Sequence, residues 1–306
     1  MKIVFMGTPD FALQSLKKLA KSQHEICAVF CQPDKPVGRS QKLQKPPVKE
    51  FADEQGIPVF QPESLKIDAV KNCIEALEPE LIAVVAYGKL LPKFILDYPR
   101  YGCVNVHGSL LPKYRGSAPV HWAVMQGETK TGVTTMYMAE EMDAGDILLT
   151  KETPIDPQET AGDVYDRLAD MGADLLLETI EKLESGDVKP IPQDATLVSF
   201  APMLKKEMGK IDWTKSSEEI VNQIRGLNPW PVAYTSTNKG ILKIYRAEKE
   251  QIPSDLPPGT VIENPASLII KTGDGCISLK EVQLQGKRKM EIVDFIRGNT
   301  ISIVLD

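Results

Sequence analysis

The chain has 306 residues, a length that suits one large or two ordinary domains. Its 42% hydrophobic and 25% charged residues are typical of a globular protein and exclude disordered, collagen-like and fibrous classes. The net charge of −6 argues against a nucleic acid or an anionic membrane as a partner of the chain as a whole. No apolar run approaches the roughly 20 residues that span a bilayer, and the run over 3–6 is too short for a signal peptide, so we expect a cytoplasmic protein.

Short apolar segments alternate with amphipathic ones along the first half of the chain. The pattern predicts strands over 2–6, 26–31, 81–87 and 103–106, with helices over 10–21 and 46–56. Strands this apolar are buried on both faces, as in a parallel sheet covered by helices. We therefore predict an open, mostly parallel, Rossmann-like α/β sheet, whose ligands bind beyond the carboxyl ends of the strands.

The pattern changes in the second half. Strands over 131–138 and 146–150 precede a long amphipathic helix over 160–184, and residues 185–206 then lose periodicity and contain three prolines. A helix over 216–227 leads into short predicted strands that indicate a small β-barrel, over 232–237, 241–247, 258–263, 267–271, 275–279 and 281–286. The predicted domains are 1–189 and 207–306, joined by a linker over 190–206.

Charge is unevenly distributed along the chain. Residues 201–306 carry 15 basic and 13 acidic side chains, a net charge of +2, so the first 200 residues carry −8. Within them, residues 33–49 have five basic side chains against one acidic, a net charge of +4. A solvated loop explains this run as well as a ligand site does, although the run follows a strand at the ligand-binding edge. The five cysteines include no C-x-x-C pair, which favours buried thiols over disulfides or zinc.

One segment carries residues suited to carbonyl chemistry. Asn105 and His107 are two apart in a predicted strand and therefore share a face. An Asn amide can donate to a developing oxyanion, and His titrates near neutrality. Asp143, in a loop between two strands, could return to the same strand ends. From these residues alone a structural role for His107 stays open, while His24 and His121 suit surface or packing positions.

A glycine turn after the first strand invites a different interpretation. The sequence Gly7-Thr8-Pro9-Asp10 lacks the later glycines of a dinucleotide fingerprint, and Pro9 removes an amide donor. A tight turn with proline at the helix start is the better explanation. A nicotinamide- or flavin-dependent oxidoreductase is therefore disfavoured.

Seven motifs together resemble the folate-dependent formyltransferase family. They are GTPDF (7–11), QPDKPVGR (32–39), AYGKLLP (86–92), NVHGSLLPKYRG (105–116), APVHWAVMQG (118–127), DAGDIL (143–148) and NPWP (228–231). The likeness to the broader family covers the N-terminal half, and the likeness to its methionyl-tRNA formyltransferase branch covers nearly the whole chain. The basic segment over 33–49 and the second domain narrow the resemblance to the methionyl-tRNA formyltransferase branch.

The resemblance implies a reaction and a set of site residues. The co-substrate would be 10-formyltetrahydrofolate, without a metal, and the acceptor the α-amino group of methionyl initiator tRNA, giving N-formylmethionyl-tRNA for translation initiation. The implied catalytic residues are Asn105, His107 and Asp143 in the domain over 1–189. Folate would be bound by Ser109, Leu110, Leu111, Pro112, Leu90 and Leu91. The tRNA would be bound by Arg39, Lys42 and Lys45 together with the OB-like domain, and we expect a monomer.

Two other functions compete with this expectation. A folate formyltransferase acting on a small amine, such as an amino sugar nucleotide or glycinamide ribonucleotide, would share the three catalytic residues. The basic segment and the second domain favour tRNA over it. A non-catalytic RNA-binding protein on a relic domain is disfavoured because Asn105, His107 and Asp143 are all present.

Overall fold

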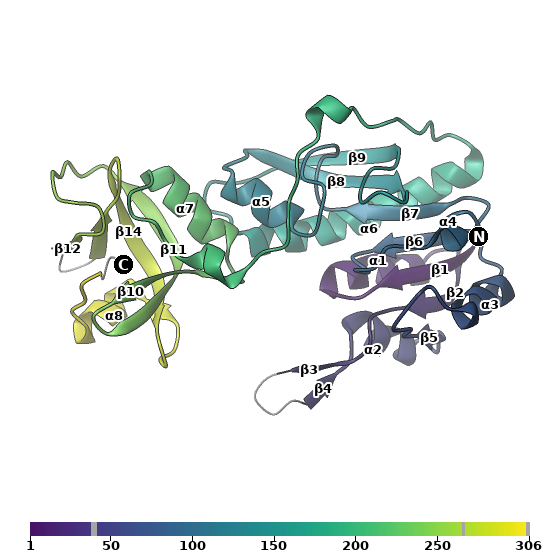
Figure 1. Ribbon diagram of the computed structural model, residues 1–306, viewed down its shortest axis with the longest axis horizontal. Helices are drawn as coiled ribbons and strands as arrows, with labels where there is room; N and C mark the ends of the chain where they lie inside the picture. Colours follow the sequence, from purple (N-terminus) through teal and green to yellow (C-terminus); the bar gives the residue numbers. More distant parts are fainter. Residues whose placement is uncertain (38–41, 265–266, 304–306) are drawn as a thin grey trace. The chain divides into compact units, whose positions relative to one another are not determined.

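The computed structural model describes residues 1–37, 42–264 and 267–303, and its chain divides into two compact units (Figure 1). The first unit contains Met1–Pro119, Thr131–Thr153 and Tyr165–Ala201, and the second contains Val120–Lys130, Pro154–Val164 and Pro202–Asp306. Each is described by itself below. No helix within the described residues is long and apolar enough to cross a membrane.

The first unit is built on a seven-stranded sheet of order β5-β2-β1-β6-β7-β8-β9 (Figure 1). The pairs from β5 through β7 are parallel, whereas β7 and β8 are antiparallel. The strands are β1 (Lys2–Gly7), β2 (Glu25–Phe30), β5 (Val59–Phe60), β6 (Leu81–Val85), β7 (Cys103–His107), β8 (Lys130–Tyr137) and β9 (Ile147–Pro154). The predicted mostly parallel sheet is confirmed.

Helices cover both faces of this sheet, which explains why its central strands are apolar throughout. They are α1 (Asp10–Ala20), α2 (Pro47–Glu54), α3 (Asp68–Leu77), α4 (Lys93–Leu96) and α6 (Ala161–Ser185). One face packs Val4 and Val84 against Ile74 of α3 and Ile95 of α4. On the other face Gly172 of α6 lies so close to Val106 that an added Cβ would meet its Cγ1 at 2.8 Å. Alternate residues of β7 therefore face α6, and Asn105 and His107 point away from it.

The basic segment over 33–49 contains a small antiparallel hairpin. Its strands are β3 (Lys35–Val37) and β4 (Lys42–Gln44), and Lys35 pairs with Gln44 at its base. The sequence pattern predicts only a loop here because strands of three residues leave no periodicity to detect. The hairpin leaves the sheet after β2 and returns into α2 (Figure 1).

The second unit contains an antiparallel sheet of order β10-β11-β14-β13-β12, with β15 paired to β14. Its core consists of buried hydrophobic side chains from α7, α8 and the sheet, such as Ile224, Ile244 and Phe295. The elements are α5 (Pro119–Met125), the 3-10 turn η2 (Lys206–Gly209), α7 (Ser217–Gly226), β10 (Ala233–Thr237), β11 (Gly240–Glu250), β12 (Val261–Asn264), β13 (Ser267–Lys271), β14 (Cys276–Leu284), β15 (Met290–Glu291) and α8 (Ile292–Gly298). The antiparallel sheet expected of a barrel-like domain is confirmed.

One strand boundary in this unit was predicted wrongly. The sequence pattern gives two strands, over 275–279 and 281–286, whereas the structure has the single strand β14. Lys280 looks like a break between them, but its side chain is paired with Glu248 of the neighbouring strand β11. A polar residue on the outer face of a continuous strand leaves the same pattern as a turn.

Candidate active site

The end of β7 holds the first two predicted catalytic residues. Asn105 pairs with Val84 of β6 and Met136 of β8, and His107 pairs with Thr134 of β8, so both sit in the middle of the sheet. Their side chains are buried, with 9% and 6% of their surface exposed. Among the described residues no hydrogen bond is found for the Asn105 amide, which leaves its two donors for a ligand.

The contacts of His107 define its tautomer. Its Nε2 lies 2.9 Å from the carbonyl oxygen of Tyr114. Because a carbonyl only accepts, Nε2 must carry a hydrogen and donate it. The other ring nitrogen, Nδ1, lies 3.8 Å from Oδ2 of Asp143, which is beyond hydrogen-bond distance. Nδ1 is therefore the ring nitrogen available to a reacting molecule, on the side of the carboxylate.

The third predicted residue, Asp143, reaches His107 from the loop between β8 and β9. Its backbone has φ +52°, an uncommon left-handed conformation for a residue with a side chain. Its Oδ2 accepts a hydrogen bond of 2.8 Å from the amide of Gly116. Gly145 lets the loop return to β8, since a Cβ there would meet the Tyr137 carbonyl oxygen at 1.9 Å. The structure thus brings the side chains of Asp143 and His107 close together.

Gln193 holds the Asp143 loop, and no sequence pattern identifies it. Its Nε2 donates to the carbonyl oxygens of Asp143 and Gly145, both at 2.8 Å. Its Oε1 accepts from Nε and Nη2 of Arg115, at 3.0 and 2.8 Å. Arg115 is itself buried, with Glu141 at 3.6 Å. The side-chain amide of Gln193 therefore holds the Asp143 loop in place, and the Arg115 guanidinium in turn holds Gln193.

The segment after Gln193 also supports the site. The amide of Tyr114 donates to the Ser199 hydroxyl at 2.9 Å, and the amide of Arg115 donates to the Ser199 carbonyl at 2.8 Å. The backbone amide of Ala201 donates a hydrogen bond of 2.7 Å to the Arg115 carbonyl oxygen. Ser199 and Ala201, within the segment 190–206 that was expected to be a linker, therefore help to position the Tyr114 carbonyl that orients His107.

The predicted folate residues occupy two turns near β7. Ser109 is fully buried, and its hydroxyl donates to the Lys113 carbonyl at 2.6 Å, so this hydroxyl is committed within the protein. Thr134 ties the turn to β8 by donating to the Ser109 carbonyl and accepting from the Leu111 amide. In the turn after β6, Leu91 is buried in the core and Leu90 is 60% exposed. Leu110 and Pro112 are half-buried and Leu111 is buried.

The predicted tRNA residues belong to the basic segment over 33–49. Arg39 lies outside the described residues, and of Lys42 only the backbone, in β4, is described. Lys45 follows β4 and forms an exposed ion pair of 2.8 Å with Asp53 of α2. Exposed ion pairs of this kind contribute little to stability, so a phosphate could replace the carboxylate.

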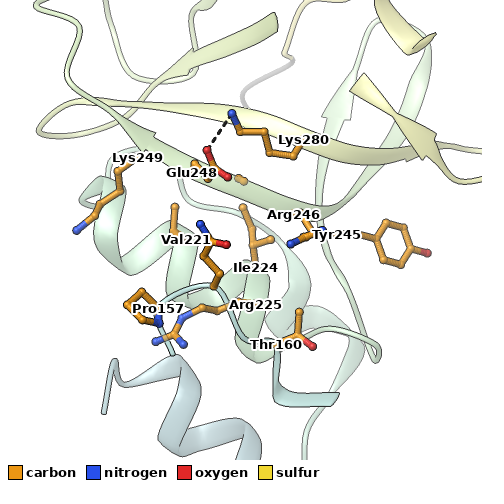
Figure 2. A pocket seen from close by; sticks show the side chains of 12 residues that line it. Pro157, Thr160, Val221, Ile224, Arg225, Tyr245, Arg246, Glu248, Lys249 and Lys280 are labelled. Atoms are coloured by element: carbon orange, nitrogen blue, oxygen red, sulfur yellow. Dashed lines mark ion pairs between the residues drawn. The ribbon is translucent and has the colours of Figure 1, made fainter. Parts of the chain in front are cut away.

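The second unit has a cleft that contains none of the predicted site residues. Figure 2 shows Arg225, Glu248, Lys249 and Lys280 around this cleft of about 170 Å³. Lys280 is paired with Glu248 at 3.0 Å, and Lys249 lies 3.4 Å from Glu218. The Arg225 guanidinium donates to Asn222 and to two backbone carbonyls. Because three of its cations have partners, this cleft is a weaker candidate than the strand ends of the first unit.

Comparison with known proteins identifies relatives along both units. The family described as "Formyl transferase" matches residues 1–180, and "Formyl transferase, C-terminal domain" matches residues 203–300. A curated relative, methionyl-tRNA formyltransferase of Desulforamulus reducens, is 51% identical over 99% of this chain and 96% of its own length. Methionyl-tRNA formyltransferase of Alkaliphilus oremlandii is 47% identical over 98% of this chain and 97% of its own length.

Solved structures share the fold at lower identity. WlaRD, a sugar 3N-formyl transferase solved with dTDP and 5-N-formyl-THF, has a TM-score of 0.70 and 22% identity, covering 94% of this chain and 99% of its own. HypX of Aquifex aeolicus, solved with tetrahydrofolic acid, has a TM-score of 0.65 and 19% identity over 97% of this chain. The chain spans about half of HypX, 47% of its length. On the family matches and the near-full-length relatives, the chain belongs to the formyl transferase family.

Proposed function

We propose that the protein transfers the formyl group of 10-formyltetrahydrofolate to the α-amino group of methionyl initiator tRNA. The observation that carries this proposal is the 51% identity, over nearly the full length of both chains, with a methionyl-tRNA formyltransferase. The approach of Asn105, His107 and Asp143 at the end of β7 supports the chemical part of it. The product, N-formylmethionyl-tRNA, would serve translation initiation in the cytoplasm.

The reaction needs charge stabilisation more than activation of the nucleophile. An α-amino group has a reference pKa of about 7.7–8.0, so part of it is neutral near pH 7. The amine nitrogen would attack the formyl carbon, and the carbonyl electron pair would move to oxygen. The unpaired amide donors of Asn105 would then hydrogen-bond to this oxyanion inside a buried site, where such bonds are strong.

His107 and Asp143 would handle the protons through the free ring nitrogen. Since Nε2 donates to Tyr114, only Nδ1 faces the reacting atoms and the Asp143 carboxylate. When the His107 ring is protonated, its Nδ1–H would donate a hydrogen bond to the oxyanion or transfer its proton toward the leaving group. As the tetrahedral intermediate collapses, the bond from carbon to N10 of the folate breaks, and the proton lost by the amine arrives at N10.

Binding of the two substrates would use different parts of the first unit. The backbone of residues 109–112 and the exposed Leu90 would line the folate site, because the Ser109 hydroxyl is already committed. The hairpin of β3 and β4 would contact tRNA phosphates through Arg39, Lys42 and Lys45. Lysines of the second unit would add phosphate contacts.

A transfer assay tests the proposal directly. Purified protein and 10-formyltetrahydrofolate are incubated with charged initiator tRNA, charged elongator tRNA or a nucleotide-linked amino sugar. We expect formylmethionyl initiator tRNA as the main product. Transfer to the amino sugar, with none to tRNA, would overturn the proposed acceptor.

A further inference from the structure

A half-buried ion pair closes the base of the hairpin formed by β3 and β4. Asp34 immediately precedes β3, and Lys49 lies in the first turns of α2, just after β4. The Lys49 ammonium donates to both carboxylate oxygens of Asp34, at 2.9 and 3.0 Å. Only 18% of the Lys49 side chain and 26% of the Asp34 side chain are exposed. The two chain segments that enter and leave the hairpin are thus joined by one charged contact.

Gln61 completes this contact and connects it to the sheet. Its Oε1 accepts from the Lys49 ammonium at 2.7 Å, and its Nε2 donates to Asp34 Oδ1 at 2.8 Å. The same Nε2 lies 2.8 Å from the carbonyl oxygen of Gln32. The hydrogen bond from Gln61 and the contact with Lys49 hold the pKa of the Asp34 carboxyl below its usual value, so it is ionised at neutral pH. We name Asp34, Lys49 and Gln61 the hairpin clamp.

The hairpin clamp is anchored at the ligand-binding edge of the sheet. The side-chain amide of Gln32 donates to the carbonyl oxygen of Tyr87 at 2.9 Å, and its backbone N–H donates to the Thr8 hydroxyl at 3.2 Å. Tyr87 lies in the turn after β6 that contains the predicted folate residues Leu90 and Leu91. The orientation of the hairpin is therefore fixed to the turns that follow β1 and β6.

We propose that Asp34, Lys49 and Gln61 are positioning residues, which hold the basic hairpin in the orientation that binds tRNA. This inference rests on the proposed function. It removes Lys49 from the cations that contact phosphate, since the Lys49 ammonium is already held by three protein oxygens. Arg39, Lys42 and Lys45 would contact phosphates, and the clamp would keep the strands β3 and β4 in place.

Replacing Asp34 separates positioning from simple electrostatics. Asp34→Asn makes the segment one unit more positive, so attraction alone predicts tighter tRNA binding and a lower KM. Positioning predicts the opposite. If the hairpin keeps its binding orientation for a tenth of the time, the KM for methionyl-tRNA rises roughly tenfold. The kcat and the KM for the folate stay within about twofold of those of the unmodified protein.

Two further variants make the test decisive. Gln61→Met keeps all charges and is expected to raise the KM for tRNA several-fold through the lost hydrogen bonds alone. Glu75→Gln, on the exposed surface of α3, adds the same positive charge away from the clamp and should leave all constants unchanged. An unchanged or lower KM for tRNA in both Asp34→Asn and Gln61→Met would overturn the proposal, as would an equal rise in the KM for folate.

Hydrogen exchange separates failure of the clamp from failure of the proposed function. The amides of β3 and β4 are compared between the unmodified protein and Gln61→Met, without any substrate. Faster exchange confined to these strands is expected if the clamp orders the hairpin. Unchanged exchange would overturn the clamp whatever the acceptor. Formylation of an amino sugar in place of tRNA would refute the proposed function and, with it, the role of the clamp in tRNA binding.

Discussion

Replacing Gln193 by Ala should impair the reaction through the Asp143 loop, although Gln193 touches no reacting atom. The substitution removes four hydrogen bonds, two to loop carbonyls and two from the Arg115 guanidinium. Net contributions of about 1 kcal/mol for a neutral bond and about 1.5 kcal/mol for a charged one, reduced because water can reach a half-buried site, give a loss of about 2–4 kcal/mol. The loop accounts for about half of this loss.

The rate effect follows from the loop part of that loss. If about 1–2 kcal/mol of loop ordering disappears, Asp143 faces Nδ1 of His107 less often, and kcat falls roughly five- to thirtyfold. We would measure kcat at saturating concentrations of both substrates, together with thermal unfolding. Gln193→Glu is the matched variant, because it keeps the acceptor for Arg115 but turns a carboxylate toward the loop carbonyls. It should keep most of the stability and lose most of the rate.

The result that would refute this reasoning is a Gln193→Ala protein with lower stability and unchanged kcat. The position of the Asp143 loop would then not limit the reaction. An exposed neighbour serves as the control, since Lys189→Ala should change neither quantity. A fall in kcat for the control would point instead to a general effect of substitutions near the start of this segment.

Three other substitutions test the site and the fold. Asn105→Ala should lower kcat by about 10²–10³, the usual effect of removing an oxyanion donor, with little change in thermal unfolding. Gly145→Ala should lower both stability and kcat, because its Cβ would meet the Tyr137 carbonyl oxygen at 1.9 Å, whereas Gly298→Ala has open space around it and should fold normally. Burial lowers the pKa of His24 below its usual 6.5. The unfolded state therefore binds more protons as pH falls through about 6.5, and stability declines there. His24→Gln should flatten this decline in urea unfolding measured at pH 7.5 and 5.5.

The sequence predicts the elements whose signal is local. Asn105 and His107 are recognisable because a strand places residues two apart on the same face, and the apolar β6 and β7 indicate a buried parallel sheet. Asp143 is suggested by its loop but is tied to His107 only by the resemblance to a family. The hydrophobic pattern alone would not bring together two side chains 36 positions apart.

The supporting residues could not be predicted, for a physical reason. Gln193 bonds to carbonyls 48 and 50 residues away, and a hydrogen bond to backbone carries no sequence pattern. Its neighbours contain prolines and lack periodicity, which is typical of a linker. An irregular segment that is ordered by hydrogen bonds to a site has the same sequence pattern as a linker that makes no such bonds.

A count of charges likewise cannot show which basic side chains are already paired with acidic groups of the protein. Residues 33–49 have a net charge of +4, yet Lys49 is held by Asp34 and Gln61, and Lys45 has Asp53 as a partner from outside the segment. The exposed Lys45 pair is weak enough for a phosphate to displace the carboxylate, but the half-buried Lys49 pair is not. Fewer cations than the count suggests are therefore available to tRNA. Affinity must then depend more on where the hairpin holds them than on how many there are, and holding the hairpin is the role that we propose for the clamp.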